Sequence, residues 1–340
     1  MKCIVTGATG HIGNVLVRQL HEAGHQITAL VLPRDEVQFI EPFCDIAYGN
    51  ILDKPSLVEL FRGADWVFHL AGIVEIGSGK KKILYKVNVE GTKNCVDAAI
   101  EAGVKRFVYT SSVHAIPELP KWETMREIDS FDPKLVKGIY AKTKAMATAY
   151  VLSRRGNGTE IVIVHPSGVI GPADHKLSNI SQLFIDCLCG RMSVYLRGGY
   201  NFVDVRDVAS GILLAAQRGV DGSCYILSGS EVTVKELLDA ITNEIGFKPI
   251  KTKLNFWFIL AMSYFAELYY KIVKQKPLFT HYSIIVLNSN YRFSNELAKA
   301  ELGYSTRAIS ETIHDTLDFA KANFVTKVGK RYVRKAQDKS

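Results

Sequence analysis

A glycine-rich segment near the start of the chain constrains the fold more than any other feature. The segment TGATGHIG runs from Thr6 to Gly13, directly after the strand-like MKCIV and before a helical pattern. Glycines at such a junction permit a tight turn and let the backbone approach a pyrophosphate, and the helix N-terminus offers unpaired N–H groups. A mere tight turn is the alternative interpretation. The order of strand, loop and helix favours a dinucleotide site built on Gly7, Gly10 and Gly13.

Short apolar runs alternate with amphipathic segments through the first half of the chain. The expected strands are 27–31, 66–72, 106–112 and 160–166. The expected helices are 12–23, 57–62, 87–103 and 139–154. Nearly continuous Val and Ile in the strands is typical of strands that are buried on both faces of a sheet. The pattern therefore predicts an α/β fold with a parallel, doubly wound sheet.

The second half has a looser pattern. We expect a helix over 180–190, a strand that turns into a helix over 202–219, a strand over 223–229 and a helix over 233–246. Thr233 suits the N-cap of the last of these helices. The remainder, 247–340, is interpreted as helical and aromatic. The expected organisation is a dinucleotide-binding domain over 1–172, a smaller substrate lobe over 173–325 whose chain crosses back to the first domain, and a basic tail over 326–340.

Charge and cysteine content bear on partners and location. The formal net charge is +8, and much of the excess lies near the C-terminus, at Lys327, Lys330, Arg331, Arg334, Lys335 and Lys339. We interpret that stretch as solvated and expect no nucleic-acid partner, because the sequence has no recognisable reader motif. The six scattered cysteines are interpreted as buried thiols of a reducing compartment, the cytoplasm. The spacing of Cys187 and Cys189 is not that of a zinc site, so we expect no metal.

Two further stretches concern membranes. MKCIV already resembles a strand, so we expect no targeting segment ahead of the fold. The apolar run Leu254–Tyr270 is interrupted by Glu267 and is slightly short for a membrane span. We favour a helix that lines a greasy pocket, and core packing or weak peripheral contact with a membrane stay open as alternatives.

Tyr140 and Lys144, in YAKTK, stand four residues apart on an expected helix, so their side chains project from one face. A free tyrosine has a pKa of about 10, and a neighbouring ammonium favours the phenolate. Tyr140 could then exchange a proton with a substrate oxygen near neutral pH. The Tyr-x-x-x-Lys spacing is common on helices, and it becomes informative only in combination with the glycine motif.

Three hydroxyl residues, Thr110, Ser111 and Ser112, end the expected strand 106–112. Ligands of open parallel sheets bind beyond the carboxyl ends of the strands, so a hydroxyl there could hydrogen-bond a substrate oxygen. A serine-rich strand end without function is the alternative. We favour Ser112 for the catalytic role, with Ser111 as the other candidate.

Over nearly its whole length the chain resembles the extended short-chain dehydrogenases/reductases, which include the NAD-dependent epimerases and dehydratases. The matching segments are TGATGHIG, HLAG, VNVEGT, YTSS, YAKTK, HPSGVIGP and FVDVRDVA. The closest resemblance within them is to the 3β-hydroxysteroid dehydrogenase and dihydroflavonol 4-reductase branch, through the aromatic C-terminal stretch, KPLFT and YRFSNELAKAELGYS. The resemblance implies a Rossmann-type domain with a smaller, mostly helical C-terminal substrate lobe, and a pocket for a hydrophobic substrate.

The resemblance also implies roles for single residues. Tyr140 would be the acid/base, Lys144 would tune its pKa and bind the ribose, and Ser112 would hydrogen-bond the substrate oxygen. Asn50 stands where an aspartate is usual, so its amide would serve the adenine edge. The complete set expected at the cofactor is Gly7, Thr9, Gly10, His11, Ile12, Gly13, Arg34, Asn50, Ile51, Leu70, Ala71, Gly72, Asn88, Ser111, Tyr140, Lys144, Pro166, Gly168 and Val169.

The choice between NAD and NADP is poorly signalled. An acid that ends the second strand would bind the ribose 2′-hydroxyl, and an arginine would accept a 2′-phosphate. Leu32 occupies that place. Arg34, two residues later, could reach a phosphate or could be a solvated loop charge, and it tips our expectation slightly towards NADP.

We expect an oxidoreductase that interconverts a secondary alcohol and a ketone on a small hydrophobic substrate such as a steroid or flavonoid, and a homodimer is conceivable. A nucleotide-sugar epimerase or dehydratase is the main rival. Those enzymes usually place an arginine on the substrate pyrophosphate where this chain has Tyr200, Asn201 and Phe202, and losing it removes a bidentate clamp. A non-catalytic cofactor sensor or scaffold is the rival of another class, and the presence of both Tyr140 and Lys144 argues against it.

Overall fold

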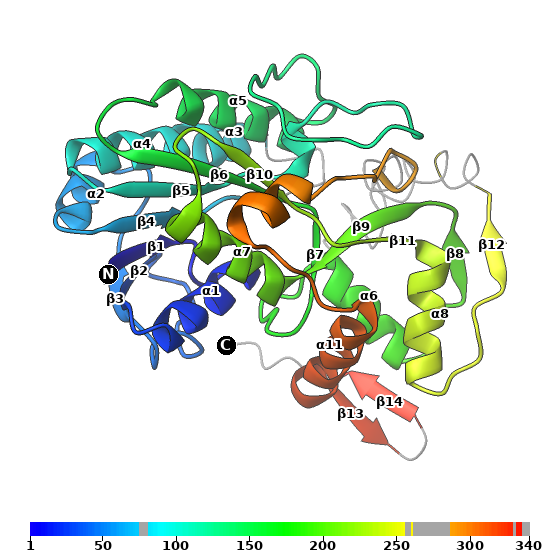
Figure 1. The fold of residues 1–340 in the computed structure, drawn as a ribbon. Helices are drawn as coiled ribbons and strands as arrows, with labels where there is room; N and C mark the ends of the chain where they lie inside the picture. The colour runs from blue at the N-terminus through cyan, green and yellow to red at the C-terminus, as the bar shows by residue number, and fades with distance from the viewer. Residues whose placement is uncertain (75–80, 256–259, 261–285, 329–330, 335–340) are drawn as a thin grey trace.

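The computed structural model describes residues 1–74, 81–255, 260, 286–328 and 331–334. A seven-stranded, all-parallel sheet forms its centre, in the order β10-β6-β5-β4-β1-β2-β3 (Figure 1). The strands are β1 Lys2–Thr6, β2 Gln26–Val31, β3 Asp45–Tyr48, β4 Trp66–His69, β5 Arg106–Thr110, β6 Glu160–Pro166 and β10 Cys224–Leu227. This confirms the doubly wound, Rossmann-type α/β fold expected from the sequence. The sequence analysis missed β3, whose four residues are only partly buried or exposed.

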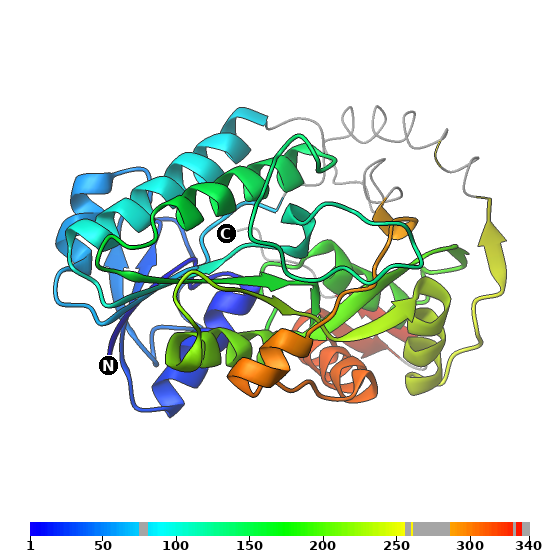
Figure 2. The same ribbon diagram turned by 45° about the horizontal axis from the view of Figure 1, so that its top comes forward.

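Helices cover both faces of this sheet, as Figure 2 shows. One face carries α1 His11–Glu22 and α7 Val205–Arg218, and the other carries α2 Lys54–Phe61, α4 Thr92–Glu101 and α5 Ile139–Ser153. Side chains of a strand alternate between the two cores, so Phe107 and Tyr109 pack on the side of α4 and α5 while Val108 packs on the side of α1. Burial on both faces explains why these strands are so apolar.

The helical stretch expected over 87–103 is longer and less regular than the sequence suggests. It consists of α3 Lys81–Tyr85, a π-helical segment Lys86–Gly91 and α4. π-helical turns occur frequently at functional sites. Here the irregular segment carries Asn88, one of the expected site residues.

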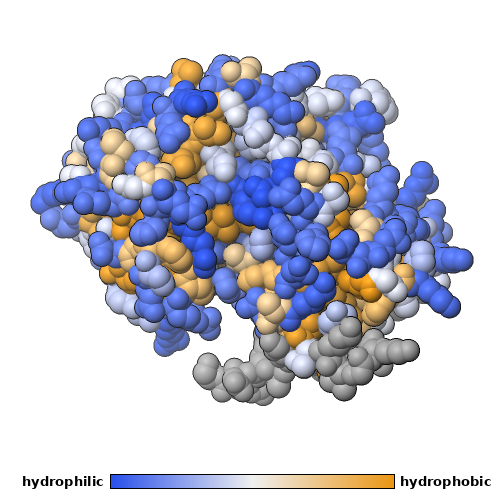
Figure 3. Space-filling model, turned by 60° about the horizontal axis from the view of Figure 1, so that its bottom comes forward, coloured by the Kyte–Doolittle hydropathy of each residue, from blue (hydrophilic) through white to orange (hydrophobic). Residues whose placement is uncertain are grey.

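The second half builds a smaller layer beside the carboxyl ends of the central strands. It contains a three-stranded sheet of β7 Gly168–Ile170, β9 Gly199–Asp204 and β11 Ser230–Thr233, and a pair formed by β8 Val194–Leu196 and β12 Thr252–Leu254. Its helices are α6 Asn179–Leu188, α8 Val234–Glu244 and α11 Ile309–Phe324. A separate hydrophobic core lies between these helices and β9. The face turned forward in Figure 3 is mainly hydrophilic, with apolar side chains between the polar ones.

Thr233 caps α8 as expected, and it forms a reciprocal capping box with Glu236. The C-terminal part differs more from the expectation of a helical region with a solvated tail. It contains a π-helical turn, Ala298–Leu302, and an antiparallel hairpin of β13 Val325–Val328 and β14 Arg331–Arg334.

The aromatic stretch Leu254–Tyr270 falls largely outside the described residues, so its three alternative interpretations stay predictions. Within the described part of the chain, no helix is long and apolar enough to cross a membrane.

Candidate active site

The glycine loop between β1 and α1 has no room for a side chain at Gly7 or Gly13. Gly7 has a φ of +73°, and a Cβ there would lie 2.6 Å from the backbone N of Ala71. A Cβ at Gly13 would lie 2.2 Å from the Gly7 carbonyl oxygen. Gly10 is the N-cap of α1 and provides no side-chain cap, so the first-turn N–H groups keep their capacity to bind an anion. This bare, positively polarised cradle fits the pyrophosphate of a dinucleotide.

A buried histidine ties the loop to the neighbouring strand. His69 Nδ1 lies 2.7 Å from Thr6 Oγ1, and its Nε2 lies 2.9 Å from Thr92 Oγ1. Burial lowers the pKa of His69 to about 3, so the ring is neutral at pH 7. The Thr6 hydroxyl also accepts a 3.3 Å bond from the Ala71 N–H. The segment Leu70–Gly72 is thereby fixed beside the glycine loop, where the sequence analysis expected it to follow the cofactor.

Asn88 holds the chain just beyond that segment. Its Oδ1 accepts a hydrogen bond from the Ile73 N–H at 2.8 Å, and its Nδ2 donates to the Ile73 carbonyl at 3.0 Å. A Cβ at Gly72 would meet Asn88 Oδ1 at 3.4 Å and Lys144 Nζ at 3.6 Å. Both distances correspond to ordinary van der Waals contact, and they place Gly72 beside the Lys144 ammonium. Asn88 therefore positions backbone near Lys144 in this structure.

Tyr140 and Lys144 lie one turn apart on α5, and both are buried. The Lys144 ammonium donates a 2.9 Å hydrogen bond to the Thr110 carbonyl at the end of β5, and it lies 5.1 Å from the centre of the Tyr109 ring. Burial lowers the pKa of Lys144 to about 8. The ammonium is therefore predominantly charged at pH 7, with a fixed position at the carboxyl edge of the sheet.

The structure separates the two serine candidates. Ser111 Oγ lies 2.7 Å from Thr148 Oγ1 on α5, inside the core, and Thr148 in turn donates to the Lys144 carbonyl. Ser112 caps a short 3-10 helix, Val113–Ala115, and its Oγ accepts a 3.2 Å bond from the His114 N–H. The Ser112 hydroxyl retains its proton for a further acceptor, whereas Ser111 has a structural partner. This geometry favours Ser112 over Ser111 for contact with a substrate.

Pro166, Gly168 and Val169 lie at the end of β6 and the start of β7. A Cβ at Gly168 would be 2.3 Å from Cδ1 of Tyr200, so the glycine makes room for that aromatic ring. His11 Nε2 donates a 2.9 Å bond to the Pro172 carbonyl, which joins the start of α1 to the same loop. Ile12 packs against the core below it.

The residues expected at the adenine end of the cofactor differ in their surroundings. Asn50 is exposed, and its Oδ1 accepts a bond from the Leu52 N–H at 3.0 Å. Ile51 is buried against Gly91, where a Cβ would come within 2.4 Å of its Cδ1, so its side chain serves the core. Arg34 is exposed on the loop after β2.

The sequence analysis missed a polar cluster at this end. Asp35 Oδ2 accepts hydrogen bonds from the Thr9 hydroxyl at 3.0 Å and from the Leu32 N–H at 3.2 Å. Lys176, from the loop after β7, contacts both Thr9 Oγ1 at 2.9 Å and Asp35 Oδ1 at 3.3 Å. No local sequence motif predicts this cluster, because its members lie far apart in the sequence.

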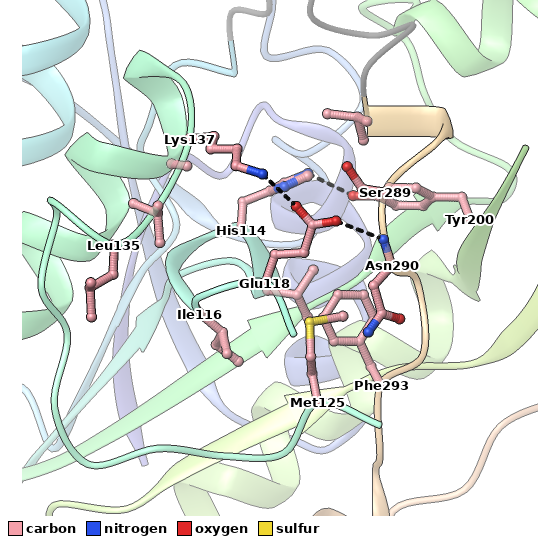
Figure 4. Close-up of a pocket in the computed structure, with 14 residues that line it drawn as sticks. His114, Ile116, Glu118, Met125, Leu135, Lys137, Tyr200, Ser289, Asn290 and Phe293 are labelled. Atoms are coloured by element: carbon pink, nitrogen blue, oxygen red, sulfur yellow. Dashed lines mark hydrogen bonds and ion pairs between the residues drawn. The ribbon is translucent and has the colours of Figure 1, made fainter. Parts of the chain in front are cut away.

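Figure 4 shows a partly open pocket. Its wall includes Val113 and Ala141, the chain neighbours of Ser112 and Tyr140, and His114, whose ring packs against that of Tyr140. The described residues that line it are Val113, His114, Ile116, Glu118, Met125, Leu135, Val136, Lys137, Ala141, Tyr200, Val286, Ser289, Asn290 and Phe293. Most of them are apolar. Among the polar residues of the wall, Lys137 and Glu118 form an ion pair at 3.4 Å. His114 and Tyr200 are joined by a hydrogen bond of 2.6 Å. In the sequence, Tyr200 drew attention only because it stands in the segment where nucleotide-sugar enzymes usually carry an arginine. His114 was not among the predicted site residues.

These features agree with what the comparisons with known proteins found. The model of the NAD dependent epimerase/dehydratase family matches residues 3–227. The chain belongs to that family. The match includes every residue expected at the active site, from the glycine loop to Val169. Because the family is NAD-dependent and its members similar to this chain include reductases and dehydrogenases, the protein is an enzyme, an NAD-dependent oxidoreductase.

Individual relatives cover nearly the whole chain. Sterol demethylase protein B of Methylococcus capsulatus is 31% identical over 318 residues, which cover 91% of this chain and 95% of the relative. A putative dihydroflavonol 4-reductase of Synechocystis sp. is also 31% identical, over 92% of each chain. A 3-beta-hydroxysteroid dehydrogenase of Mycolicibacterium neoaurum is 27% identical. The crystal structure of gox2253 matches with a TM-score of 0.81 and 32% identity, over 94% of this chain and 97% of that one. The resemblance to this branch is thereby confirmed.

Proposed function

We propose that this family member interconverts a secondary alcohol and a ketone on an apolar, polycyclic substrate such as a hydroxysteroid. The observation that carries the proposal is the mainly apolar pocket wall, which includes Val113 and Ala141, the chain neighbours of Ser112 and Tyr140. Its two charged groups, Lys137 and Glu118, pair with each other. Relatives named for sterols, hydroxysteroids and dihydroflavonol support the same substrate class.

We assign the chemistry to Tyr140, Lys144 and Ser112. A reduced nicotinamide cofactor, held by the glycine loop and Lys144, would supply a hydride to the carbonyl carbon in the reducing direction. The growing charge on the carbonyl oxygen is stabilised by the Ser112 hydroxyl, and Tyr140 Oη delivers a proton to that oxygen. The fixed charge of Lys144 favours the resulting phenolate. In the oxidising direction the phenolate removes the proton from the alcohol.

The enclosed volume limits which part of a ligand the described pocket holds. It amounts to about 110 Å³, which suits the reacting ring of a polycyclic ligand, and the rest would extend through the open side. Tyr200 and Phe202 stand in the segment where nucleotide-sugar enzymes usually carry an arginine. Asn201 between them is buried and bonded to Ser167 and Gly229. This segment offers no cation to a pyrophosphate, which argues against the epimerase alternative.

A substrate panel tests the proposal. Hydroxysteroids, ketosteroids, flavonoid ketones and UDP-sugars are supplied with each nicotinamide cofactor, and absorbance at the nicotinamide band is followed. We expect turnover of steroids or flavonoids at micromolar concentration and none of UDP-sugars. Tight UDP-sugar binding without any response to polycyclic ligands would support the epimerase. Cofactor binding without turnover or ligand binding would support the non-catalytic sensor.

Some predictions made from the sequence stay proposals. They are the division at residue 172, the cytoplasmic location, a homodimer and weak peripheral contact with membranes. All six cysteines are free thiols, which is consistent with a reducing compartment. Size-exclusion chromatography and vesicle co-sedimentation would test the last two.

A further inference from the structure

His114 and Tyr200 form a hydrogen-bonded pair in the pocket wall. His114 belongs to the 3-10 helix that Ser112 caps, and Tyr200 belongs to β9 of the second layer. Tyr200 Oη lies 2.6 Å from His114 Nε2, and Figure 4 shows the two side chains meeting at the pocket. The pair therefore joins the catalytic strand end to the smaller layer.

The pair also adjoins the reacting groups. The His114 ring packs edge-on against the Tyr140 ring, with 6.0 Å between the ring centroids, and it lies equally far from the Tyr200 ring. On its other side, the Tyr200 ring lies against Gly168, which has no side chain to displace it. The His114 ring therefore lies between Tyr200 and Tyr140, the residue to which proton transfer is assigned.

The pair carries no charge. Burial lowers the pKa of His114 to about 4, so its ring is neutral at pH 7, with one donor and one acceptor nitrogen. Tyr200 Oη can give its proton to His114 Nε2 and still accept a hydrogen bond, or it can accept from Nε2 and donate elsewhere. Such a pair suits a hydroxyl or a keto oxygen. It is poorly suited to phosphate, because the only cation among the described pocket residues, Lys137, already contacts Glu118.

We propose that Tyr200 Oη, held in place by His114, binds a second, uncharged oxygen of the substrate, on the ring system that carries the reacting carbon. The inference rests on the proposed function and refines it, because it names the substrate feature that the enzyme selects. A ligand with this oxygen gains one hydrogen bond that a ligand without it does not make, so the first is bound more tightly.

The test measures binding without turnover. The full chain is saturated with oxidised cofactor, which has no hydride to give, and ketones are titrated calorimetrically in matched pairs. One pair is a saturated 3-oxosteroid and its 2- or 4-hydroxy counterpart. The other is cyclohexanone and 2-hydroxycyclohexanone. We expect the wild-type complex to bind the hydroxylated member about 3- to 10-fold more tightly, the range of one hydrogen bond between neutral groups.

Two variants and a control locate the effect. Tyr200→Phe should abolish the preference and leave the affinity for the unsubstituted ketone within about twofold. His114→Phe removes the partner that orients Tyr200 and should reduce the preference. Tyr195→Phe, on β8 and absent from the pocket wall, should retain it in full.

The outcomes separate the inference from the proposed function. Equal binding of both members of a pair to wild type overturns the inference and leaves the function intact, as does an equal loss of affinity for both in Tyr200→Phe. A preference seen only with the cyclohexanones supports the role of Tyr200 and contradicts the steroid assignment. Absence of binding by either pair overturns both.

Discussion

Asp35 accepts a hydrogen bond of 3.0 Å from the hydroxyl of Thr9, in the glycine loop. Leu32, which directly follows β2, donates its N–H to the same carboxylate. The turn after β2 thereby brings an acid back to the strand end, although the strand itself ends without one. An acid at this place binds a free ribose 2′-hydroxyl and repels a 2′-phosphate. The structure thus offers an argument for NAD that opposes the one from Arg34 for NADP, and the Lys176 ammonium, 3.3 Å from Asp35, offsets part of the repulsion.

We expect the wild-type protein to bind NADH more tightly than NADPH, and Asp35→Asn to narrow the ratio by about five- to tenfold, the effect of about 1 kcal/mol of charge repulsion. Fluorescence titration of both reduced cofactors measures it. Arg34→Ala is the comparison. If Arg34→Ala weakens NADPH far more than NADH, and Asp35→Asn leaves the ratio unchanged, then Arg34 reads a phosphate and the preference is NADP.

Tyr140→Phe should lower kcat by about 10² to 10⁴, the usual contribution of a general acid or base. The ring remains in place, so cofactor affinity should change little. Tyr150→Phe provides a control on the same helix, because its hydroxyl bonds to Asp97 and lies away from the pocket. Near wild-type turnover by Tyr140→Phe would show that another group transfers the proton.

Lys144 should make stability depend on pH. Its pKa is about 8 in the folded protein because of burial, against 10.5 ordinarily. Between these two values the unfolded chain binds more protons than the folded one, so stability rises with pH through that window. The destabilisation caused by the buried charge is complete below pH 8 and has disappeared by about pH 10.5.

Lys144→Met should therefore have a larger free energy of unfolding than wild type at pH 7. The gain should be at most about 3 kcal/mol, reduced by the loss of the hydrogen bond to Thr110, and it should be smaller at pH 10. Urea denaturation without cofactor at both pH values measures it. Lys142→Met changes an exposed lysine on the same helix and should show no such trend. A Lys144→Met advantage that is equal at both pH values would place the pKa of Lys144 outside this window.

Local patterns sufficed for much of this molecule. The glycine loop, the alternation of strands and helices and the Tyr140–Lys144 spacing are sequence-local, and each appears where expected. Contacts between distant residues could not be predicted in the same way. Asp35 meets Lys176 across the sheet edge, and His114 meets Tyr200 only because β9 lies next to β7. β3 was not predicted because it is an edge strand of only four residues. A strand that is at most half-buried has few apolar residues and therefore a weak sequence pattern.

The two serines at the end of β5 should respond differently to truncation. Ser112→Ala removes the hydroxyl that caps a short helix and that we assign to the substrate oxygen, so we expect kcat to fall by about tenfold or more. Ser111→Ala removes the hydrogen bond to Thr148 Oγ1 and leaves Thr148 only its bond to the Lys144 carbonyl, so it should lower the free energy of unfolding by about 1 kcal/mol with little change in kcat. Steady-state kinetics and urea denaturation of both variants separate these effects. The reverse pattern would assign Ser111 to the substrate.

The glycines of the loop should also separate binding from folding. Gly10 has an extended backbone, with φ of −80°, and a Cβ there would meet only the Gly7 carbonyl oxygen, at 3.1 Å. Gly10→Val should therefore fold, while its branched side chain obstructs a pyrophosphate at the start of α1. Gly13→Ala should lower stability itself, because its Cβ would lie 2.2 Å from the same oxygen. Calorimetric NADH titration and thermal unfolding of both variants test this contrast, and unchanged NADH affinity in a folded Gly10→Val protein would refute the assigned position of the pyrophosphate.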